Sequence, residues 1–155
     1  MKKFLLRLLI LTLSFTAVFL SGCETVSGES EKESLPPINF EQYVEIGENT
    51  VVITVSSEVM DITSKTVLVD YMNLLKEAKV LDFGIKDGMV NSINGKENPA
   101  DWSACWMLYT NDTEFANTEW GTVTVDGVIY PSAVLGAESL PIKDGKVYVW
   151  EYKTF

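Results

Sequence analysis

Residues 64–78 read SKTVLVDYMNLLKEA, and this stretch decides the fold class. Apolar side chains recur in it at spacings of three and four, at Val67, Leu68, Tyr71, Leu74, Leu75 and Ala78. The polar residues Asp70, Asn73, Lys76 and Glu77 face away from this stripe, so one face of a helix is apolar and the other is solvated. The spacing predicts a single amphipathic helix, with Ser64 or Thr66 as its N-cap.

On both sides of this helix the sequence alternates as β-strands do. The β-branched run Val51–Val55 precedes it. Five further strands with their turns follow it: Met89–Ile93 before Asn94-Gly95, Ala104–Thr110, the pair Thr122–Val125 and Val128–Tyr130 around Asp126-Gly127, and Lys146–Tyr152. Gly84 and Asp87-Gly88 are typical of turns. One helix and about five to seven strands predict an α+β domain with the helix on one face of a sheet.

The first residues have the composition of an export signal. Lys2, Lys3 and Arg7 are basic, and an apolar stretch over 8–20 follows them. This stretch is shorter than the roughly 20 residues that a membrane-spanning helix needs. It ends in Leu20-Ser21-Gly22-Cys23, which resembles the lipobox of bacterial lipoproteins.

The resemblance implies that residues 1–22 are a signal peptide removed by a peptidase that cuts before Cys23. It also implies that the Cys23 thiol carries a diacylglycerol with fatty acyl chains such as palmitate. Two acyl chains suffice for stable anchoring. The expected location is therefore the extracytoplasmic face of the cell membrane.

After the lipidated cysteine, the chain is rich in Ser and Glu and is closed by Pro36-Pro37. This composition predicts a disordered acidic tether over 23–39 and a folded domain over 40–155. The chain of 155 residues has a formal net charge of −10. Such an acidic protein lacks the positive surface that nucleic acid binding requires.

Nothing in the sequence selects an enzymatic mechanism, and we expect a binding protein rather than an enzyme. There is no histidine, so the commonest general base and metal ligand is missing. Cys105 alternates with Met107 and Tyr109, which favours a small buried side chain over a nucleophile. Asn111, Asp112 and Glu114 could chelate calcium, but a solvated turn is the favoured interpretation. No catalytic residue, metal site or cofactor is predicted.

Four segments in order resemble a known family. They are the helix, Met89-Val90-Asn91-Ser92-Ile93-Asn94-Gly95, Cys105-Trp106-Met107-Leu108-Tyr109, and Leu140-Pro141-Ile142-Lys143-Asp144-Gly145-Lys146-Val147-Tyr148. Each motif is short, but together they resemble the transcobalamin-like C-terminal domain, whose bacterial members are often lipoproteins (domain-of-unknown-function family 4430). The resemblance covers Val51 to Phe155. It implies a single small β-grasp-like domain, with one main helix packed on a mixed or antiparallel sheet.

In transcobalamin and intrinsic factor the similar domain caps a bound corrinoid. The resemblance therefore implies a ligand site at Asn91, Ser92, Asn94 and Trp106. This chain departs from the family over 113–133, where an inserted β-hairpin is expected. It also lacks the helical-barrel domain that forms the other half of the vertebrate site.

The tryptophans allow both structural and binding roles. Trp150 alternates with Tyr148 and Tyr152, so these three side chains share a sheet face and are expected in the core. For Trp106, core packing is also the favoured interpretation from the alternation. Trp102 follows Pro99 in a loop, where an aromatic side chain is equally well explained as a platform for a stacked ligand or as structure.

Two functions follow as hypotheses. The first is a membrane-anchored module that captures a small ligand, such as the corrinoid cobalamin, and delivers it to a membrane transporter. The second is a cell-surface module for protein–protein interaction without a small-molecule ligand. A concave pocket would favour the first, and an exposed apolar patch or sheet edge without a pocket the second.

Overall fold

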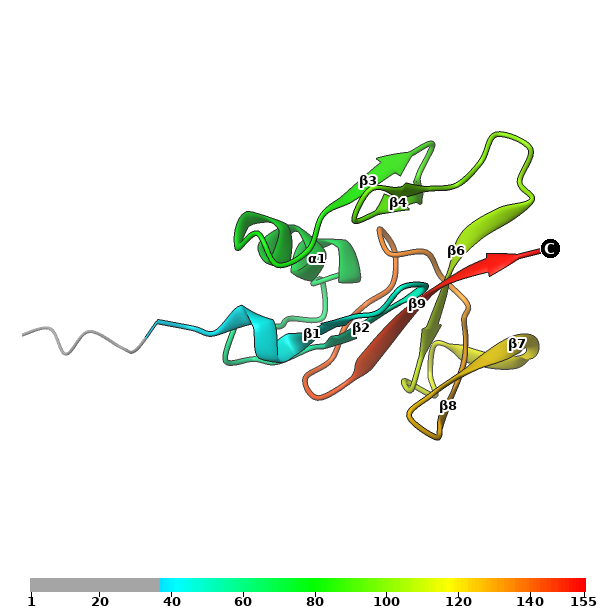
Figure 1. Cartoon of the computed structure of the whole chain (residues 1–155). Helices are drawn as coiled ribbons and strands as arrows, with labels where there is room; N and C mark the ends of the chain where they lie inside the picture. Colours follow the sequence, from blue (N-terminus) through cyan, green and yellow to red (C-terminus); the bar gives the residue numbers. More distant parts are fainter. Residues whose placement is uncertain (1–36) are drawn as a thin grey trace, which may run out of the picture. The chain divides into compact units, whose positions relative to one another are not determined.

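The computed structural model describes residues 37–155 (Figure 1). The predicted signal peptide, Cys23 and most of the predicted tether lie outside the described residues. The first described element begins at Phe40, where the folded domain is predicted to begin. Within the described part, no helix has both the length and the apolar character needed to cross a membrane.

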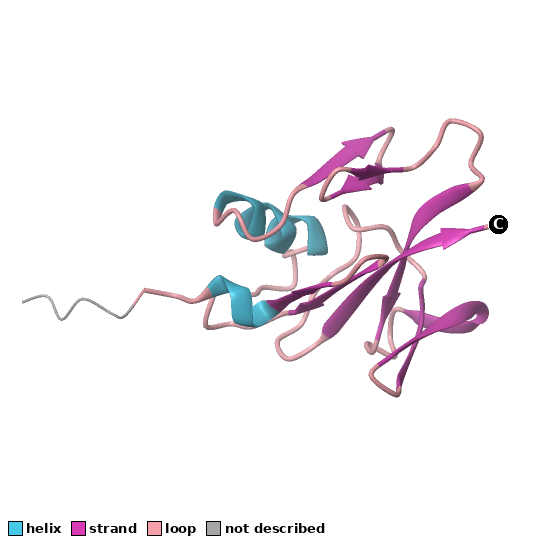
Figure 2. Cartoon of the chain, in the orientation of Figure 1, coloured by secondary structure: helices cyan, strands magenta, loops and turns pink. Residues whose placement is uncertain are grey.

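The described domain is α+β, as predicted, with one α-helix among nine strands (Figure 2). The elements in chain order are the 3-10 helix η1 (Phe40–Tyr43), β1 (Val44–Ile46), β2 (Thr50–Thr54), α1 (Leu68–Glu77), β3 (Phe83–Lys86), β4 (Met89–Ile93), β5 (Lys96–Glu97), β6 (Ala104–Thr110), β7 (Ala116–Val125), β8 (Val128–Ala133) and β9 (Val147–Thr154). The predicted inserted hairpin is present as β7 and β8.

The strands form two sheets. Six of them lie in the order β1-β2-β9-β6-β8-β7, and β3, β4 and β5 form a separate three-stranded sheet. Every pair of described neighbours is antiparallel, so of the two sheet types expected the antiparallel one is correct. β9 lies at the centre of the larger sheet, between β2 and β6.

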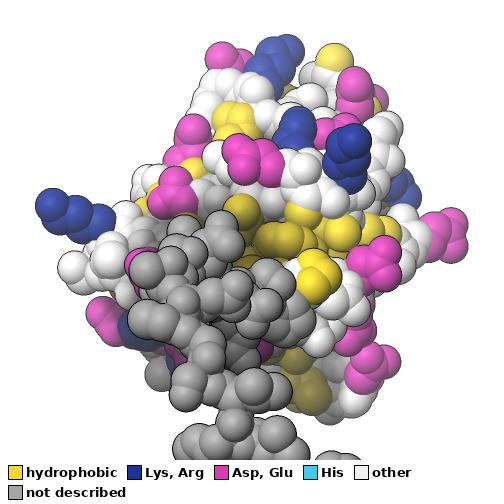
Figure 3. Space-filling model, turned by 90° about the vertical axis from the view of Figure 1, so that its left-hand side faces the viewer, with side chains coloured by type: hydrophobic (Ala, Val, Ile, Leu, Met, Phe, Trp, Pro, Cys, Tyr) yellow, Lys and Arg dark blue, Asp and Glu magenta, His cyan; other side chains and the backbone are white. Residues whose placement is uncertain are grey.

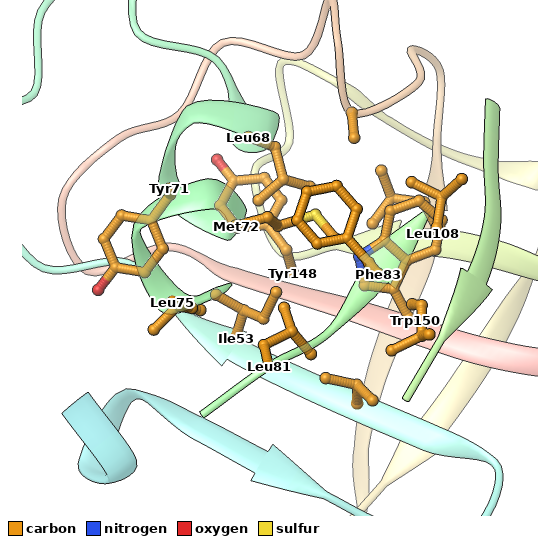
Figure 4. Packing of buried hydrophobic residues seen from close by; sticks show 14 of the residues in the cluster. Ile53, Leu68, Tyr71, Met72, Leu75, Leu81, Phe83, Leu108, Tyr148 and Trp150 are labelled. Atoms are coloured by element: carbon orange, nitrogen blue, oxygen red, sulfur yellow. The ribbon is translucent and has the colours of Figure 1, made fainter. Parts of the chain in front are cut away.

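The helix packs across one face of the larger sheet and forms the main core there. Leu68, Tyr71, Met72 and Leu75 of α1 are fully buried. Figure 4 shows them meeting Ile53 from β2, Phe83 from β3 and the β9 side chains Tyr148 and Trp150. The predicted core position of Tyr148 and Trp150 is confirmed, and Tyr152 packs against the same cluster.

The helix begins differently from the prediction. Its N-cap is Val67, whose backbone N–H donates to the Asp70 carboxylate at 3.0 Å. Thr66 instead accepts a hydrogen bond from the backbone N–H of Thr63 through its hydroxyl at 2.9 Å. The Thr66 hydroxyl is therefore used in the preceding turn, and neither predicted cap residue is the N-cap.

Three two-residue turns join hairpins as their sequences predict. In Asp87-Gly88, Asn94-Gly95 and Asp126-Gly127 both residues have positive φ, the geometry that matches the right-handed twist of the paired strands. Gly84, in contrast, was predicted at a turn and lies inside β3, paired with Ser92. A Cβ there would lie 2.8 Å from the Ser92 hydroxyl, so the close approach of the two strands requires glycine.

The β7–β8 hairpin, at one edge of the larger sheet, also packs against side chains on the face opposite the helix. Val123 and Tyr130 of the hairpin pack on Tyr109 and Val149 as a second, smaller cluster. Figure 3 shows the surface of the domain from the left-hand side of Figure 1. Where grey residues do not cover it, charged side chains lie around a band of hydrophobic ones. The domain thus has two cores, one on each face of the central strands β6 and β9.

Candidate ligand-binding cleft

A cleft of about 310 Å³ lies where β8 separates from β6. β6 pairs with β9 over seven residue pairs but with β8 at one pair only, Tyr109 with Ser132. The chain after Ser132 runs away from β6, and the β3–β4 hairpin lies on the other side. The space between is lined by residues 105–108, 132–138 and 88–90 together with Asn98, Trp102, Trp120 and Trp150.

All four tryptophans of the chain line this cleft. Trp106 and Trp150 are buried, whereas the side chains of Trp102 and Trp120 are 52% and 62% exposed. The remaining lining is mostly apolar and includes the exposed Met89. Large apolar side chains left in water at a concave surface are typical of ligand sites.

Trp106 supports the cleft rather than offering a free polar group. Its indole N–H donates to the backbone carbonyl of Lys96 at 2.8 Å, and its ring packs edge-on against Tyr152 with centroids 5.3 Å apart. The predicted core position of Trp106 is confirmed, and the same side chain lines the cleft. Trp150 differs, because among the described residues its buried indole nitrogen has no hydrogen-bond partner.

Trp102 is held in an unusual backbone conformation. Its φ is 58°, in the left-handed region that bulky residues seldom adopt. The turn that produces this conformation is closed by a hydrogen bond from the Trp102 N–H to the Pro99 carbonyl at 3.0 Å. Such strain persists only where the surroundings impose it, and it occurs often at binding sites. Here it leaves the indole half exposed at the cleft.

Trp120 reaches the cleft because the β7–β8 ladder is interrupted. Asn117 pairs with Ser132 and Thr122 with Pro131, so the residues between, 118–121, have no partner in β8. Pro131 cannot donate to a ladder, which is consistent with the irregularity at this point. The Ser132 hydroxyl donates to the Trp120 carbonyl at 3.3 Å and fixes the irregular segment. The bulge directs Trp120 out of the hairpin.

Asn98 joins the two sheets beside the cleft. Its side-chain oxygen accepts from the Trp106 N–H at 2.9 Å, and its side-chain nitrogen donates to the Val90 carbonyl at 3.3 Å. Its backbone N–H donates to the Asn91 carbonyl at 2.8 Å. The Asn98 side chain thus helps to fix the position of β4 relative to β6 at the edge of the cleft.

A second, more polar depression of about 540 Å³ adjoins the cleft. The two share Met89, Asn98 and Trp102, and the second is also lined by Asn91. Asn91 has no partner in β3, since Ser92 pairs with Gly84 and Val90 with Ile85. Asn91 is therefore the extra residue of a β-bulge, which points its neighbours Val90 and Ile93 into the core.

The five predicted site residues are only partly together. Trp102 and Trp106 line the cleft, and Asn91 lines the polar depression on the other side of Trp102. Asn94 lies at the far turn of the hairpin, where its side-chain oxygen accepts from the Asp82 N–H at 2.8 Å. Ser92 lines neither space and packs against Gly84. Ser92 and Asn94 therefore lie outside both the cleft and the depression, and their side chains contact other parts of the small sheet and its turns.

Several residues of the cleft were not predicted from the sequence: Met89, Asn98, Met107, Trp120, Leu135 and Glu138. The exposed side of a hairpin gives no periodic signal for Trp120, because its position depends on the bulge. Asn98 has an ordinary loop composition around it. For Trp120, the only indication in the sequence is that tryptophan is abundant for so small a domain.

Cys105 lines the cleft but is not fully buried as predicted. Its sulfur lies 3.5 Å from the Met107 sulfur. Desolvation raises the pKa of the thiol, although the positive charge of Lys153 opposes this. A thiol with a raised pKa is a poor nucleophile at neutral pH.

Asp112 and Glu114, the acidic residues of the calcium alternative, have a cationic side chain as their partner. Lys143 pairs with both, at 2.9 Å from Asp112 Oδ2 and 2.7 Å from Glu114 Oε2. An ammonium group thus occupies the place between the carboxylates. Across residues 37–155 no group of three or more acidic, cysteine or histidine side chains is arranged to hold a metal ion.

The comparisons with known proteins add no relative to this description. No protein-family model, no curated protein and no solved structure matches the chain.

Proposed function

We propose that the chain is a lipoprotein, anchored through a lipid on Cys23 to the extracytoplasmic face of the cell membrane, whose domain binds a small, partly apolar molecule in the tryptophan cleft. The observation that carries the binding role is that all four tryptophans line one concave surface, two of them exposed. The anchor rests on the sequence Leu20-Ser21-Gly22-Cys23. Delivery of the ligand to a membrane transporter is part of the proposal.

The dimensions of the cleft restrict the ligand. About 310 Å³ is at the lower end of the range of small-molecule pockets, which runs from roughly 300 to 1,000 Å³. A compact molecule fits inside, and a flat ring system fits by one edge. A corrinoid, the ligand that the transcobalamin-like resemblance implies, would place one edge between Trp102 and Trp120 and extend over the polar depression beside Asn91.

Tryptophan fluorescence tests the proposal directly, because every tryptophan of the chain lies at the site. The full chain in lipid nanodiscs is titrated with cobalamin and with small aromatic compounds. We expect saturable quenching, and we expect Trp102→Ala or Trp120→Ala to weaken binding about tenfold or more, since base or ring stacking on such side chains contributes roughly 1–3 kcal/mol.

Ile129→Ala is the matched control, since Ile129 is exposed on β8 and does not line the cleft. It should leave the titration unchanged. Absence of saturable quenching by cobalamin at high micromolar concentration would remove the corrinoid as ligand. Absence of quenching by every compound would remove the cleft as a binding site.

The alternative of an interaction module has one observation in its favour. Val128 and Ile129 are exposed next to each other at the tip of the β7–β8 hairpin. Successive residues of a strand point to opposite faces, so these two aliphatic side chains do not form the continuous apolar patch that a protein interface needs. The concave cleft favours the small-molecule function.

A further inference from the structure

The charge in the lining of the cleft is negative. Among residues 37–155, Glu138 is the only charged residue that lines it, and no lysine or arginine does so. Glu138 is exposed and forms no ion pair with any residue in 37–155. Its carboxylate lies over the β3–β4 turn, where a Cβ built on Gly88 would be 3.4 Å from Oε2. The whole chain is acidic as well, with a net charge of −10.

The aromatic lining has the same electrostatic preference as Glu138. The faces of indole rings carry partial negative charge, and tryptophan is the side chain that attracts cations most strongly. Trp102, from the loop before β6, and Trp120, from β7, both line the cleft, so a ligand bound in it can contact both rings. An anion would meet no cationic side chain in the described lining, and the Glu138 carboxylate and the net charge would repel it.

From this charge complementarity we propose that the ligand of the cleft is an organic cation, with a methylated ammonium or similar diffuse charge held among Trp102, Trp120 and Glu138. The inference rests on the proposed binding function and adds the chemical class of the ligand. A diffuse cation is weakly hydrated and can enter an apolar space, whereas a primary ammonium group or a metal ion would keep its water. Aromatic surroundings are used to recognise quaternary ammonium groups for this reason.

A pair of probes that differ only in charge tests the proposal. Choline and its neutral carbon isostere, 3,3-dimethylbutan-1-ol, have the same shape and the same hydroxyl group. The full chain is placed in nanodiscs of lipids without choline head groups, and each probe is titrated against tryptophan emission. We expect choline to bind at least tenfold more tightly, which corresponds to about 1.4 kcal/mol and lies within the range of one or two cation–π contacts.

Glu138→Gln keeps the shape of the side chain and removes its charge. We expect it to weaken choline binding about threefold to tenfold and to leave binding of the isostere unchanged. Glu119→Gln is the matched control, because Glu119 is exposed on β7 one residue from Trp120 and does not line the cleft. It lowers the net negative charge equally, so it should leave both titrations almost unchanged.

Equal affinity for the two probes would overturn the cation proposal and leave the cleft as a binding site. Quenching by neutral aromatic compounds with no response to choline would do the same. If no compound of any charge changes the emission, both the cation proposal and the proposed function fail. Equal weakening by the two glutamate variants would show that choline responds to net charge and would overturn the assigned role of Glu138.

Discussion

At Trp102 the backbone and the side chain have opposing preferences. The left-handed conformation costs a bulky residue roughly 1–2 kcal/mol, and glycine adopts it without strain. Burial of the Trp102 side chain does not offset this cost, since the side chain is about half exposed. A ligand that stacks on the indole would supply the missing contact. The proposed binding role would account for a tryptophan at this position.

Trp102→Gly and Trp102→Ala separate the two effects. We expect Trp102→Gly to have a free energy of unfolding about 1 kcal/mol higher than Trp102→Ala, because only alanine retains the strain. Both variants should lose ligand quenching to the same extent. Urea unfolding followed by circular dichroism measures the first, and the titration measures the second. Equal free energies of unfolding for the two variants would contradict the proposed backbone strain at position 102.

Asp112 is the most deeply buried acidic group described, at 2% exposure. Burial by itself raises the pKa of its carboxyl. The bonds from Lys143 and from the Glu114 backbone N–H outweigh burial and hold this pKa below its ordinary value. A lowered pKa in the folded state means that ionised Asp112 stabilises the fold above the unfolded pKa. This stabilisation is lost as the pH falls below about 4.

Replacing Lys143 should reverse this dependence. In Lys143→Met the buried carboxylate of Asp112 loses this ion pair, and we expect a lower free energy of unfolding at pH 7. Burial then raises the pKa of Asp112, so protonation relieves the penalty. The stability difference from the unmodified chain should shrink between pH 7 and pH 4. Lys65→Met, at an exposed position, should show no such trend.

Among the elements, the small sheet is the one whose attachment matters most for the cleft. Asn98 connects β4 to β6 by side-chain bonds, and the Tyr152 hydroxyl adds a bond to the Glu97 carbonyl at 2.9 Å. The small sheet also contributes Phe83, Val90 and Ile93 to the main core. The hydrogen bonds of Asn98 and Tyr152 therefore fix the small sheet beside the cleft. Its apolar side chains attach it to the main core.

Asn98→Ala should loosen that edge. The Trp106 N–H and the Val90 carbonyl lose their partner, and we expect a loss of about 1–3 kcal/mol together with weaker ligand binding. Faster hydrogen exchange of the Trp106 amide is the specific measurement, since a general loss of stability would affect all amides of β6 alike. Asn73→Ala, on the exposed face of α1, is the control and should be neutral or slightly stabilising.

Long strands in which apolar and polar residues alternate could be predicted from the sequence, and short strands could not. β4, β6 and β9 and the three turns with glycine were predicted because alternation and turn composition agree there. β1, β3 and β5 have four residues or fewer, and residues of β1 and β3 are largely exposed, so their pattern is too short to recognise. The cleft follows the same rule: Trp102 was suspected from its loop, but the position of Trp120 depends on a bulge that no local pattern predicts.

At the scale of the whole molecule, the two cysteines allow a test of the anchor. Cys23→Ser should move the protein from the membrane fraction of its native host to the soluble extracytoplasmic fraction, because no thiol remains to accept lipid at that position. Cys105→Ser is the control and should stay with the membranes, since Cys105 lies within the domain. Mass spectrometry of the unmodified chain should show acylation at Cys23. An unmodified thiol there would contradict the proposed location.

The central place of β9 has a consequence for the timing of folding. Residues 147–154 are the last strand described, yet β2 and β6 can join into one sheet only through them. While the chain is being synthesised, its earlier strands therefore lack the partner that completes their hydrogen bonding. This strand order delays closure of the sheet until residues 147–154 are available. If the chain is exported as we propose, the delay would help it to stay unfolded while it crosses the membrane.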